Sequence, residues 1–537
     1  MNQVNKVDHR SSRINLKVLI TTSGVGSRLG EFTLYTNKSL VKVGDKLVIS
    51  HIVENYPEDT EFVITLGYFG KHVRDFLSIA YPKRKFEFVE ITNYEGPGSS
   101  LGLSMLLAKN HLQQPFIFHA SDTLLFDTKV TESPSVNWVA GSKGPSASQY
   151  ASLDVTSEYV MNFHDKGKIE FDYLHIGLIG IFDYLVFWQT LEKIYESNPN
   201  DNSLNDLKVL ASMKSNGTLF RFKHVEQWAD MGNTESLISA RNSFKKNYSV
   251  LEKPDESISF IDKSVIKFFS NERIVESRVE RAKLLGSLVP EITAHKGNFF
   301  RYDLIEGNLS SNKVTPEKIS SLLDWAEVNL WHPKDHLNDK EFRELCFEFY
   351  KSKTLSRITE FLEKSKFDES NFSINGQHIP LILSLLESVD FNWICDGLQT
   401  QFHGDFILDN IIETPVGFKL IDWRQDFAGN VSSGDMYYDL AKFNHSLIIN
   451  HEIVNNNYFD VEINESNIYC DIHRKHELVE SRKVLQSFMI SRGLDVRKTE
   501  VLTSLIWLNM APLHHHPFDI FLFNFGKLNL WRSLSGN

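Results

Sequence analysis

The sequence predicts two domains of different fold class: an α/β domain with a Rossmann-like, mixed but mostly parallel sheet, and then a bilobal α+β domain. The chain has 537 residues, more than one hydrophobic core usually serves. Its first half alternates short apolar runs with helix-like patterns, which is typical of parallel strands covered by helices on both faces. After a polar stretch near residue 250, strands come first and helices then dominate.

The elements of the first half follow from hydrophobic periodicity. Buried strands are expected at residues 17–22, 61–67, 86–91 and 115–121. Helices with an apolar face are expected at residues 45–56, 70–81 and 99–111. Each predicted helix lies between two predicted strands, and this order connects parallel strands through helical crossovers.

A change of composition marks the domain boundary. The segment KKNYSVLEKPDES contains few apolar residues. We therefore place a linker at residues 247–257, between a first domain at 16–246 and a second domain at 258–537. Residues 1–15 are polar and are expected to form a disordered extension.

The second domain is expected to begin with a hairpin in SISFIDKSVIKFF and an amphipathic helix in RIVESRVERAKLLGSLV. One face of that helix would carry Ile274, Val275, Val279, Ala282 and Leu285. These elements form the expected N-lobe, at about residues 258–310. The C-lobe, at about 311–537, is expected to be helical, apart from a strand–loop–strand block at 400–422.

Composition narrows the classes of function. The net charge of -12 is spread along the chain, which argues against a nucleic-acid partner because a phosphate backbone requires a basic surface. The polar start lacks the apolar segment of a signal peptide, and no stretch approaches the roughly 20 apolar residues that span a bilayer. No membrane insertion is therefore expected. Cys346, Cys395 and Cys470 are far apart, which gives no sign of structural zinc and suits a reducing cytoplasm.

The first predicted strand runs directly into Ser23-Gly24-Val25-Gly26-Ser27-Arg28-Leu29-Gly30. Glycines at this point let the backbone approach a phosphate closely, so that N–H groups can bind its oxygens. The Arg28 guanidinium can neutralise a triphosphate through paired hydrogen bonds, and Lys38 adds a cation ten residues later. The segment therefore predicts a nucleotide site.

These residues, with the run NKSLVKVGDKLVISHI that begins at Asn37, resemble the sugar-nucleotidyltransferase family. Its members join a nucleoside triphosphate to a sugar phosphate or amino-alcohol phosphate and release pyrophosphate. The family usually has Pro-Lys where this chain has Asn37-Lys38, which removes a rigid turn residue but keeps the cation. The resemblance covers nearly all of residues 17–245.

The resemblance implies roles for individual residues. Arg28 and Lys38 would be catalytic, and Asp122 and Asp230 would bind Mg²⁺. The nucleotide would contact Gly24, Gly26, Arg28, Gly98, Ser99 and Ser100. The acceptor would contact Lys166, beside Asp165, and Gly177. Taken singly, Asp122 is more often a helix N-cap, and Asp230 could cap the helix at 233–244; only the ordered occurrence of the motifs favours metal binding.

A second motif, HGDxxxxN, contains His403, Asp405 and Asn410, and Asp422 follows in Leu420-Ile421-Asp422-Trp423. This order resembles the aminoglycoside phosphotransferase and choline kinase superfamily, which is related to protein kinases. The resemblance implies a protein-kinase-like bilobal fold, with Asp405 catalytic as the base that accepts the proton of a substrate hydroxyl. Asn410 and Asp422 would hold Mg²⁺ against the phosphates of ATP, and His403 would brace the loop.

Upstream positions complete the implied ATP site. Lys267 would reach the α- and β-phosphates, paired with Glu280 or, as the less favoured choice, Glu276. Glu306 lies in the expected hinge at residues 302–307, where backbone groups would bind adenine.

Other polar residues have structural interpretations. Asp435 and Asp439, in the downstream GDMYYDLA stretch, are expected to be structural rather than catalytic. The run His514-His515-His516 is interpreted as surface or packing rather than a metal site, because consecutive histidines point in different directions on a helix.

Together the motifs predict a bifunctional enzyme that uses ATP, a second nucleoside triphosphate and Mg²⁺ at both sites. One domain would phosphorylate a small alcohol, sugar or amino alcohol, and the other would attach a nucleotidyl group to the phosphomonoester. The product would be a precursor of a capsule, another surface polysaccharide or a lipid. CTP is slightly favoured as the nucleoside triphosphate that the first domain uses. Two alternatives stay open: the domains act on different substrates of one pathway, or one is an inactive nucleotide sensor. The acceptor and the oligomeric state are also open.

Overall fold

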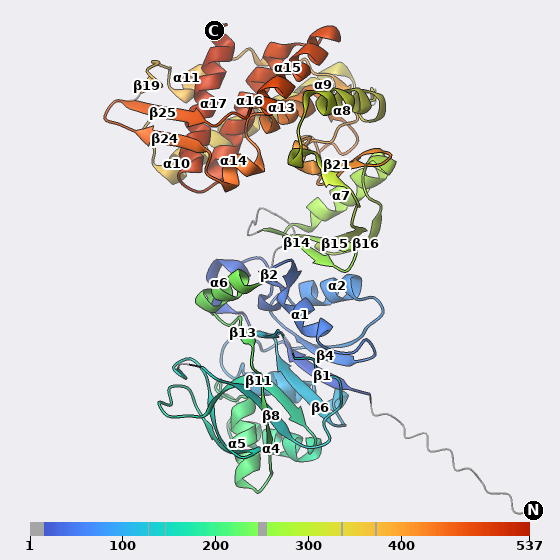
Figure 1. Cartoon of the computed structure of the whole chain (residues 1–537), viewed down its shortest axis with the longest axis vertical. Helices are drawn as coiled ribbons and strands as arrows, with labels where there is room; N and C mark the ends of the chain where they lie inside the picture. Colours follow the sequence, from blue (N-terminus) through green and yellow to red (C-terminus); the bar gives the residue numbers. More distant parts are fainter. Residues whose placement is uncertain are drawn as a thin grey trace, which may run out of the picture. The chain divides into compact units, whose positions relative to one another are not determined.

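The computed structural model describes residues 15–536, except 127, 145, 245–254, 335–336 and 371–372. The expected N-terminal extension and most of the expected linker lie outside the described residues. The chain folds into two compact units, which Figure 1 shows from blue to red along the sequence. Unit 1 comprises Met1–Glu272 with Ala294–Arg301, and unit 2 comprises Arg273–Thr293 with Tyr302–Asn537.

Unit 1 is built on a nine-stranded sheet of order β5-β4-β1-β6-β11-β8-β12-β10-β9. The strands, in this order, are Lys85–Glu90, Glu61–Leu66, Lys17–Thr21, Phe116–Ala120, Tyr173–Ile181, Trp138–Ser142, Arg221–His224, Tyr159–His164 and Ser152–Thr156. Strands β5, β4, β1 and β6 are parallel neighbours, as are β8 and β12. The remaining neighbours are antiparallel, so the sheet is mixed as expected, but parallel pairing is confined to the first four strands and the β8–β12 pair.

Helices cover both faces of this sheet, as the strand–helix alternation predicts. The helices are α1 (Val48–Glu54), α2 (Gly70–Ala80), α3 (Leu101–Leu107), α4 (Tyr184–Ser197), α5 (Asp206–Ser215) and α6 (Thr234–Ser243). Alternate residues of β1 enter different cores: Val18 and Ile20 pack with α1 and α2, and Leu19 packs with α3 and α4. Side chains alternate across a strand, and so one apolar run supplies both layers.

A second sheet has the order β14-β15-β17-β16, with strands Glu256–Ile261, Ser264–Phe269, Phe299–Asp303 and Ile292–Lys296. Strands β14 and β15 form the hairpin that the sequence predicts. Phe268 and Phe299 belong to the same core as α2, and the ring of His72 on α2 lies 5.3 Å from that of Phe268. Backbone pairing adds to this packing, because Phe260 N–H donates to the Asp45 carbonyl at 2.9 Å.

The expected N-lobe is therefore divided between the two units. The hairpin packs in unit 1, whereas α7 (Glu272–Leu285) lies almost entirely in unit 2. Val275, Val279, Ala282 and Leu285 of α7 are buried as predicted, while Ile274 is half-buried. The domain boundary at residues 247–257 stays a prediction.

Unit 2 is mainly helical from residue 316 onward, as expected (Figure 1). Its longer helices are α8 (Pro316–Asn329), α9 (Asp339–Phe347), α10 (Lys353–Ser365), α13 (Met436–Ser446), α15 (His476–Ser491), α16 (Val496–Met510) and α17 (Phe518–Ser535). The predicted strand–loop–strand block contains β21 (Ile411–Thr414) and β22 (Gly417–Leu420), which pair with each other, and β21 also pairs with β18 (Asn308–Leu309). Helices α16 and α17 pack through aromatic rings, with 4.8 Å between the rings of Trp507 and Phe525.

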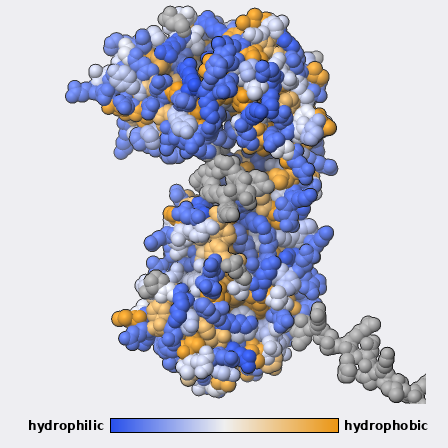
Figure 2. Space-filling model, viewed as in Figure 1, coloured by the Kyte–Doolittle hydropathy of each residue, from blue (hydrophilic) through white to orange (hydrophobic). Residues whose placement is uncertain are grey.

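On the face drawn in Figure 2, the surface of both units is mainly hydrophilic, as expected for a chain in which 23% of the residues are charged. Figure 2 shows hydrophilic side chains over most of the face drawn, with hydrophobic ones scattered on both units. Within the described part of the chain, no helix combines the length and apolar content needed to cross a membrane. His515 and His516 are exposed in the turn before α17, and the described residues hold no cluster of three or more His, Cys, Asp or Glu side chains placed to bind a metal.

Candidate functional sites

The glycine loop of unit 1 follows β1 and turns at Gly26, whose φ is 70°. A Cβ built on Gly26 would lie 3.0 Å from the Cβ of Lys38, so glycine allows Lys38 to pack against the loop. Gly24 has open space around it. Arg28 lies at the start of the 3₁₀ helix η1 (Ser27–Thr33) and is exposed.

Asn37 compensates for the proline that is usual in the resembled family. Its side chain is fully buried and donates through Nδ2 to the carbonyls of Thr22 at 2.7 Å and Tyr68 at 2.6 Å. Its Oδ1 accepts from the N–H of Ser39 at 2.9 Å. These hydrogen bonds fix the turn that carries Lys38, so the rigidity that proline would supply covalently comes here from side-chain contacts.

A short ladder brings the two predicted metal aspartates together. Strand β13 (Trp228–Asp230) pairs antiparallel with β7 (Thr123–Leu125), with Asp230 opposite Thr123. The N–H of Met231 donates to the Asp122 carbonyl at 2.7 Å. The aspartates are 108 positions apart in the sequence, and the ladder places one beside the other.

Each carboxylate has its own partners. Lys38 Nζ lies 2.9 Å from Asp122 Oδ2. The Tyr150 hydroxyl donates to Asp230 Oδ2 at 3.2 Å, and the N–H of Gly232 donates to Asp230 Oδ1 at 3.0 Å. Tyr150 precedes β9 and matches none of the motifs quoted above, so sequence reasoning missed it.

The pKa values of the Asp122 and Asp230 carboxyl groups are shifted in opposite directions. Burial alone would raise the pKa of Asp122, but Lys38 and, less strongly, Arg28 outweigh it, so that the pKa lies below its usual value. Burial and the charge of Asp122 raise the pKa of Asp230. A Cβ built on Gly232 would lie 3.0 Å from Asp230 Oδ1 and 3.4 Å from Arg28 Nη2, which places Arg28 beside the pair. Two adjacent half-buried carboxylates fit a divalent cation, which would offset their repulsion.

The predicted nucleotide turn lies near the glycine loop. Ser100 caps α3 by accepting from the N–H of Leu103 at 3.1 Å, and Ser104 on the same helix lies 2.7 Å from the Ser23 hydroxyl. Gly98 has φ 80°, and a Cβ there would lie 2.8 Å from a backbone carbonyl oxygen. Ser99 closes the turn, since its hydroxyl donates to the Gly96 carbonyl at 2.7 Å.

The two predicted acceptor residues lie in different settings. Gly177, with φ 73°, packs so closely on Ala120 that a Cβ there would lie 2.7 Å from the Ala120 Cβ. Ala120 ends β6 two residues before Asp122, so Gly177 lies at the candidate site. Lys166 is exposed after β10, and no contact within the described residues joins it to Asp122 or Asp230.

The N-terminal part of the chain resembles known nucleotidyltransferases. No family model matches the chain. The bifunctional protein GlmU of Methanococcus vannielii is 22% identical over 242 residues, which are 43% of this chain and 56% of that protein. The chain thus spans about half the length of this curated relative.

Solved structures show similarity in the same region. The CTP:phosphocholine cytidylyltransferase LicC of Streptococcus pneumoniae is 16% identical, with a TM-score of 0.37 over 43% of this chain and 99% of that one. The inositol-1-phosphate CTP transferase of T. maritima is 13% identical, with a TM-score of 0.35 over 44% of this chain and 98% of that one. The kinase-like interpretation of the remaining chain stays a prediction.

In unit 2, the predicted base Asp405 is held from two sides. Lys442 Nζ on α13 lies 2.7 Å from Asp405 Oδ1. Asn410 Nδ2 donates to Asp405 Oδ2 at 3.1 Å and to its backbone carbonyl at 3.0 Å. Burial alone would raise the pKa of Asp405, but Lys442 outweighs it, and the pKa lies below its usual value. The HGDxxxxN spacing predicts Asn410 beside Asp405, whereas Lys442 lies outside the motif.

The loop around Asp405 is braced from α13. Asp439 is fully buried and accepts from the N–H groups of His403 and Gly404, each at 2.7 Å. Burial raises the pKa of Asp439 to about 6. His403 Nε2 lies 3.0 Å from the Ile421 carbonyl and so links the loop to the segment before Asp422. These contacts agree with a structural role for Asp439.

Asp435 has a similar setting one turn earlier. It is fully buried, accepts from the N–H groups of Leu398 at 2.9 Å and Tyr437 at 3.1 Å, and receives the Tyr350 hydroxyl at 2.8 Å. Its hydrogen bonds cap α13 and fix its neighbours, which also agrees with a structural role.

Helix α7 contacts the loop through arginines that sequence reasoning did not assign. Arg278 Nη1 lies 2.6 Å from Asp422 Oδ1, and Asp422 has a φ of 60°, which is rare for a residue with a side chain. Arg281 is buried and donates to the carbonyls of Phe402 and Arg424 and, at 3.3 Å, of His403. The arginines therefore fix both the loop of Asp405 and the segment of Asp422.

The remaining predicted ATP-site residues belong to different units. Lys267 is buried in β15, within unit 1. Glu280 is exposed on α7, and Glu306 is exposed before β18, both in unit 2. The predicted Lys267–Glu280 pair would join residues of different units and stays a prediction.

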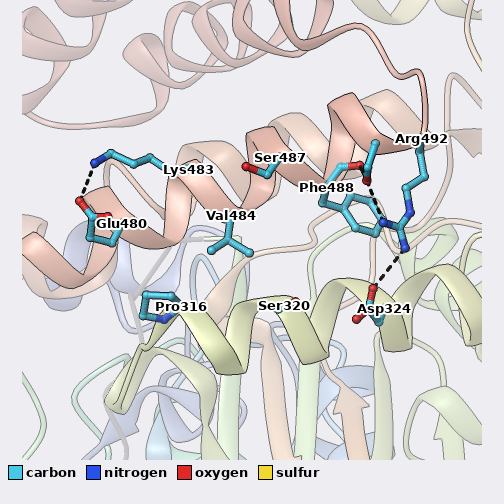
Figure 3. A pocket seen from close by; sticks show the side chains of 10 residues that line it. Pro316, Ser320, Asp324, Glu480, Lys483, Val484, Ser487, Phe488 and Arg492 are labelled. Carbon is cyan, nitrogen blue, oxygen red and sulfur yellow. Dashed lines mark hydrogen bonds and ion pairs between the residues drawn. The ribbon is translucent and has the colours of Figure 1, made fainter.

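A separate groove of about 470 Å³ lies between α8 and α15 (Figure 3). Lys483 Nζ in its wall lies 2.7 Å from Glu480, and Arg492 lies 3.3 Å from Asp324 and 2.8 Å from Glu327. The residues that line the groove include none of the predicted catalytic or metal-binding side chains.

Proposed function

We propose that unit 1 transfers a nucleotidyl group from a nucleoside triphosphate to a phosphomonoester and releases pyrophosphate. The observation that carries the proposal is the convergence of Arg28, Lys38, Asp122 and Asp230 beside the glycine loop. Nucleotidyl transfer brings anions together, and it requires cations and metal-binding carboxylates in one place. The resemblance to nucleotidyltransferases supports the same reaction.

Each residue of the candidate site has a distinct role in the proposed reaction. A phosphate oxygen of the acceptor attacks the α-phosphorus, a new P–O bond forms, and the bond to the β-phosphate breaks so that pyrophosphate leaves. Arg28 and Lys38 neutralise the phosphates, and the glycine loop lets them approach the backbone. Asp122 and Asp230 would hold Mg²⁺, which supplies positive charge to the phosphates when bound. No protein base is needed, because the attacking phosphate is already an anion.

For unit 2 we propose phosphoryl transfer from ATP to the hydroxyl of a small alcohol, sugar or amino alcohol. Asp405 would accept the hydroxyl proton, and Asn410 and Asp422 would hold Mg²⁺ on ATP. The bracing of this loop by Asp439 and Arg281 supports the proposal, because catalytic groups must be held rigidly.

The two reactions would be consecutive if the phosphomonoester made by unit 2 is the acceptor of unit 1. The product would then be an NDP-linked precursor of a surface polysaccharide or lipid, with CTP the favoured nucleotide. The alternatives are separate substrates of one pathway, or one unit as an inactive nucleotide sensor; the complete predicted site sets favour two active units.

The test is a mass-spectrometric screen of the full chain. Each nucleoside triphosphate is incubated with a panel of sugar, polyol and amino-alcohol phosphates, and pyrophosphate and nucleotide conjugates are measured. ADP release is measured separately with ATP and the parent alcohols. A conjugate from at least one pair is expected, whereas pyrophosphate release from none of them would reject the function of unit 1.

A further inference from the structure

Basic side chains gather beside Asp405 in unit 2. Lys442 contacts its Oδ1 at 2.7 Å. A Cβ built on Gly404 would lie 2.6 Å from the Arg424 Cβ, so Arg424 packs directly on the same loop. Lys353 Nζ lies 4.5 Å, and the Arg424 guanidinium 4.9 Å, from the centre of the Phe349 ring. Lys353, Arg424 and Lys442 are called the basic cluster below.

The backbone that carries this cluster is unusual. Phe349 lies in a single π-helical turn, Glu348–Ser352, and Lys353 begins α10 directly after it. Such turns are rare and are found frequently at functional sites. The Phe349 ring is fixed by stacking on Phe427 at 4.3 Å, so the platform under the two cations is rigid.

Lys353 lacks a compensating anion. Within the described part of the chain, no acceptor lies at hydrogen-bond or ion-pair distance from its ammonium group. Burial and the nearby charges of Arg424, Lys442 and Arg357 lower the pKa of Lys353 to about 6, and Asp426 opposes them only weakly. A partly buried, unpaired cation is costly, and a bound anion would remove that cost.

The groove in Figure 3 shows the contrasting case. There, Lys483 is paired with Glu480 and Arg492 with Asp324. Arg492 also pairs with Glu327, so the cations of the groove are already neutralised. Among the residues that the structure describes, Lys442 is the one member of the basic cluster with a carboxylate partner, and that partner is the predicted catalytic base.

The two oxygens of Asp405 separate the nucleotide side from the cluster. Oδ2 accepts from Asn410, the predicted metal ligand, and Oδ1 faces Lys442. The metal and the ATP phosphates are therefore expected at Oδ2, which leaves the cluster beside the hydroxyl that Asp405 would deprotonate.

We propose that the basic cluster binds an anionic group on the alcohol substrate, so that the acceptor already carries a phosphate or a carboxylate. The inference rests on the proposed kinase function of unit 2 and specifies its substrate class. The hydroxyl oxygen attacks the γ-phosphorus, the bond to ADP breaks, and the hydroxyl proton passes to Asp405, while the anionic group stays on Lys353 and Arg424. A quaternary ammonium alcohol would instead meet like charges at this position.

Sulfate is a suitable probe because it is divalent over the whole neutral pH range. Sulfate binding to the full chain is measured by calorimetry for the wild type, Lys353→Gln and the matched control Lys351→Gln, an exposed lysine of the same π-helical turn. Lys353→Gln should weaken binding about 10-fold or more, the scale of a lost charge-assisted hydrogen bond, and Lys351→Gln should not. Equal binding by all three proteins would overturn the site.

Thermal unfolding separates ligand binding from a structural role. Without sulfate and below about pH 6, where Lys353 carries its charge, Lys353→Gln should unfold at the same temperature as the wild type or higher, because the change removes an unpaired cation. Sulfate should raise the unfolding temperature of the wild type more than that of the variant. A lower unfolding temperature of Lys353→Gln with an unchanged response to sulfate would make Lys353 structural.

The source of the anion is tested by repeating the titration with a saturating non-hydrolysable Mg·ATP analogue. Persistent sulfate binding supports the acceptor assignment. Displacement of sulfate would assign the cluster to the γ-phosphate of the nucleotide and overturn the proposal.

Turnover completes the test. ADP release is compared within two pairs of substrates, each with a neutral and an anionic member. The pairs are glycerol with glycerol phosphate, and glycol with glycolate. The anionic member of at least one pair should have the higher kcat/KM, and Lys353→Gln should remove the difference by raising KM. Equal or better use of the neutral members would overturn the substrate class. If no alcohol gives ADP release, the kinase function itself is rejected. The sulfate titrations do not depend on turnover, and so they distinguish this failure from a failure of the anion site.

Discussion

At the scale of single residues, side chains of one type take different roles because their surroundings differ. Asp122 is paired with Lys38, which holds its pKa low, whereas burial and the charge of Asp122 raise the pKa of Asp230. In unit 2, Asp405 contacts a lysine and an amide, and Asp422 contacts Arg278. The motifs contain Lys38 and Asn410 as well as the aspartates, but they do not show which carboxylate each contacts, and they contain neither Lys442 nor Arg278.

The first prediction concerns the aspartate pair of unit 1. Asp122→Asn and Asp230→Asn should each lower the rate of pyrophosphate release by roughly 10²-fold or more, because a key electrostatic group is lost. ADP release by unit 2 should survive. Asp59→Asn, an exposed aspartate of the same unit, is the control for general effects of the change. Near wild-type rates in both site variants would remove the metal assignment.

The second prediction separates the aspartates of unit 2. Asp405→Asn should lower kcat by roughly 10²–10⁴-fold and leave Mg·ATP binding largely unchanged, since it removes a base and keeps the shape. Asp422→Ala should also weaken Mg-dependent nucleotide binding, because the phosphates lose their metal anchor. Calorimetric titration with Mg·ATP measures both effects. The opposite pattern of binding would show that the roles are exchanged.

At the scale of elements, short-range sequence patterns predict the helices and strands but not which element braces a site. Helix α7 was expected from its apolar face, yet its arginines hold the loops of Asp405 and Asp422. Asp439 on α13 was expected to be structural, and it accepts the two N–H groups that shape the Asp405 loop.

The third prediction tests that brace. Asp439→Asn leaves one of two buried N–H groups without an acceptor and should lower the free energy of unfolding at pH 7 by about 1–3 kcal/mol. The pKa of Asp439 is raised from 3.8 to about 6, so its protonation favours the folded state below about pH 4, and this contribution is lost as pH rises through 6. The difference between wild type and variant should therefore grow between pH 7 and pH 5.

Denaturant unfolding at pH 7 and pH 5, with hydrogen exchange of peptides from unit 2, provides the measurement. Asp460→Asn on β24 (Phe459–Ile463), which replaces an exposed aspartate, is the matched control. If Asp439→Asn is as stable as the wild type at both pH 7 and pH 5, Asp439 does not hold the loop.

At the scale of the whole molecule, the two-part organisation is clear from the sequence, but the packing of one hairpin is not. Strands β14 and β15 follow the expected linker, yet Phe268 lies in the core around α2. A polar stretch marks where the chain leaves one core, and it gives no information about which core the next strands enter. A fragment ending near residue 250 would lack side chains that cover α2.

The fourth prediction follows from this packing. Phe268→Ala in the full chain should cost about 3–5 kcal/mol, the usual effect of truncating a buried phenylalanine, and hydrogen exchange in α2 should accelerate. The control is Ile169→Ala, at a side chain that is 92% exposed. It should change neither the free energy of unfolding nor hydrogen exchange in α2. Unchanged protection of α2 in Phe268→Ala would mean that the hairpin contributes little to unit 1.

The sequence by itself determined the first strands and helices of unit 1, up to residue 121, the helical character of unit 2 and the motifs of both candidate sites. These features depend on periodicity and spacing within short segments, where neighbouring side chains decide the outcome. Only the tertiary structure decided that Asp122 meets Asp230 and Lys38, that Lys442 and Arg278 hold the aspartates of unit 2, and that no anion among the described residues pairs with Lys353. These contacts join residues far apart in the chain, so they follow from how the elements pack and not from local pattern.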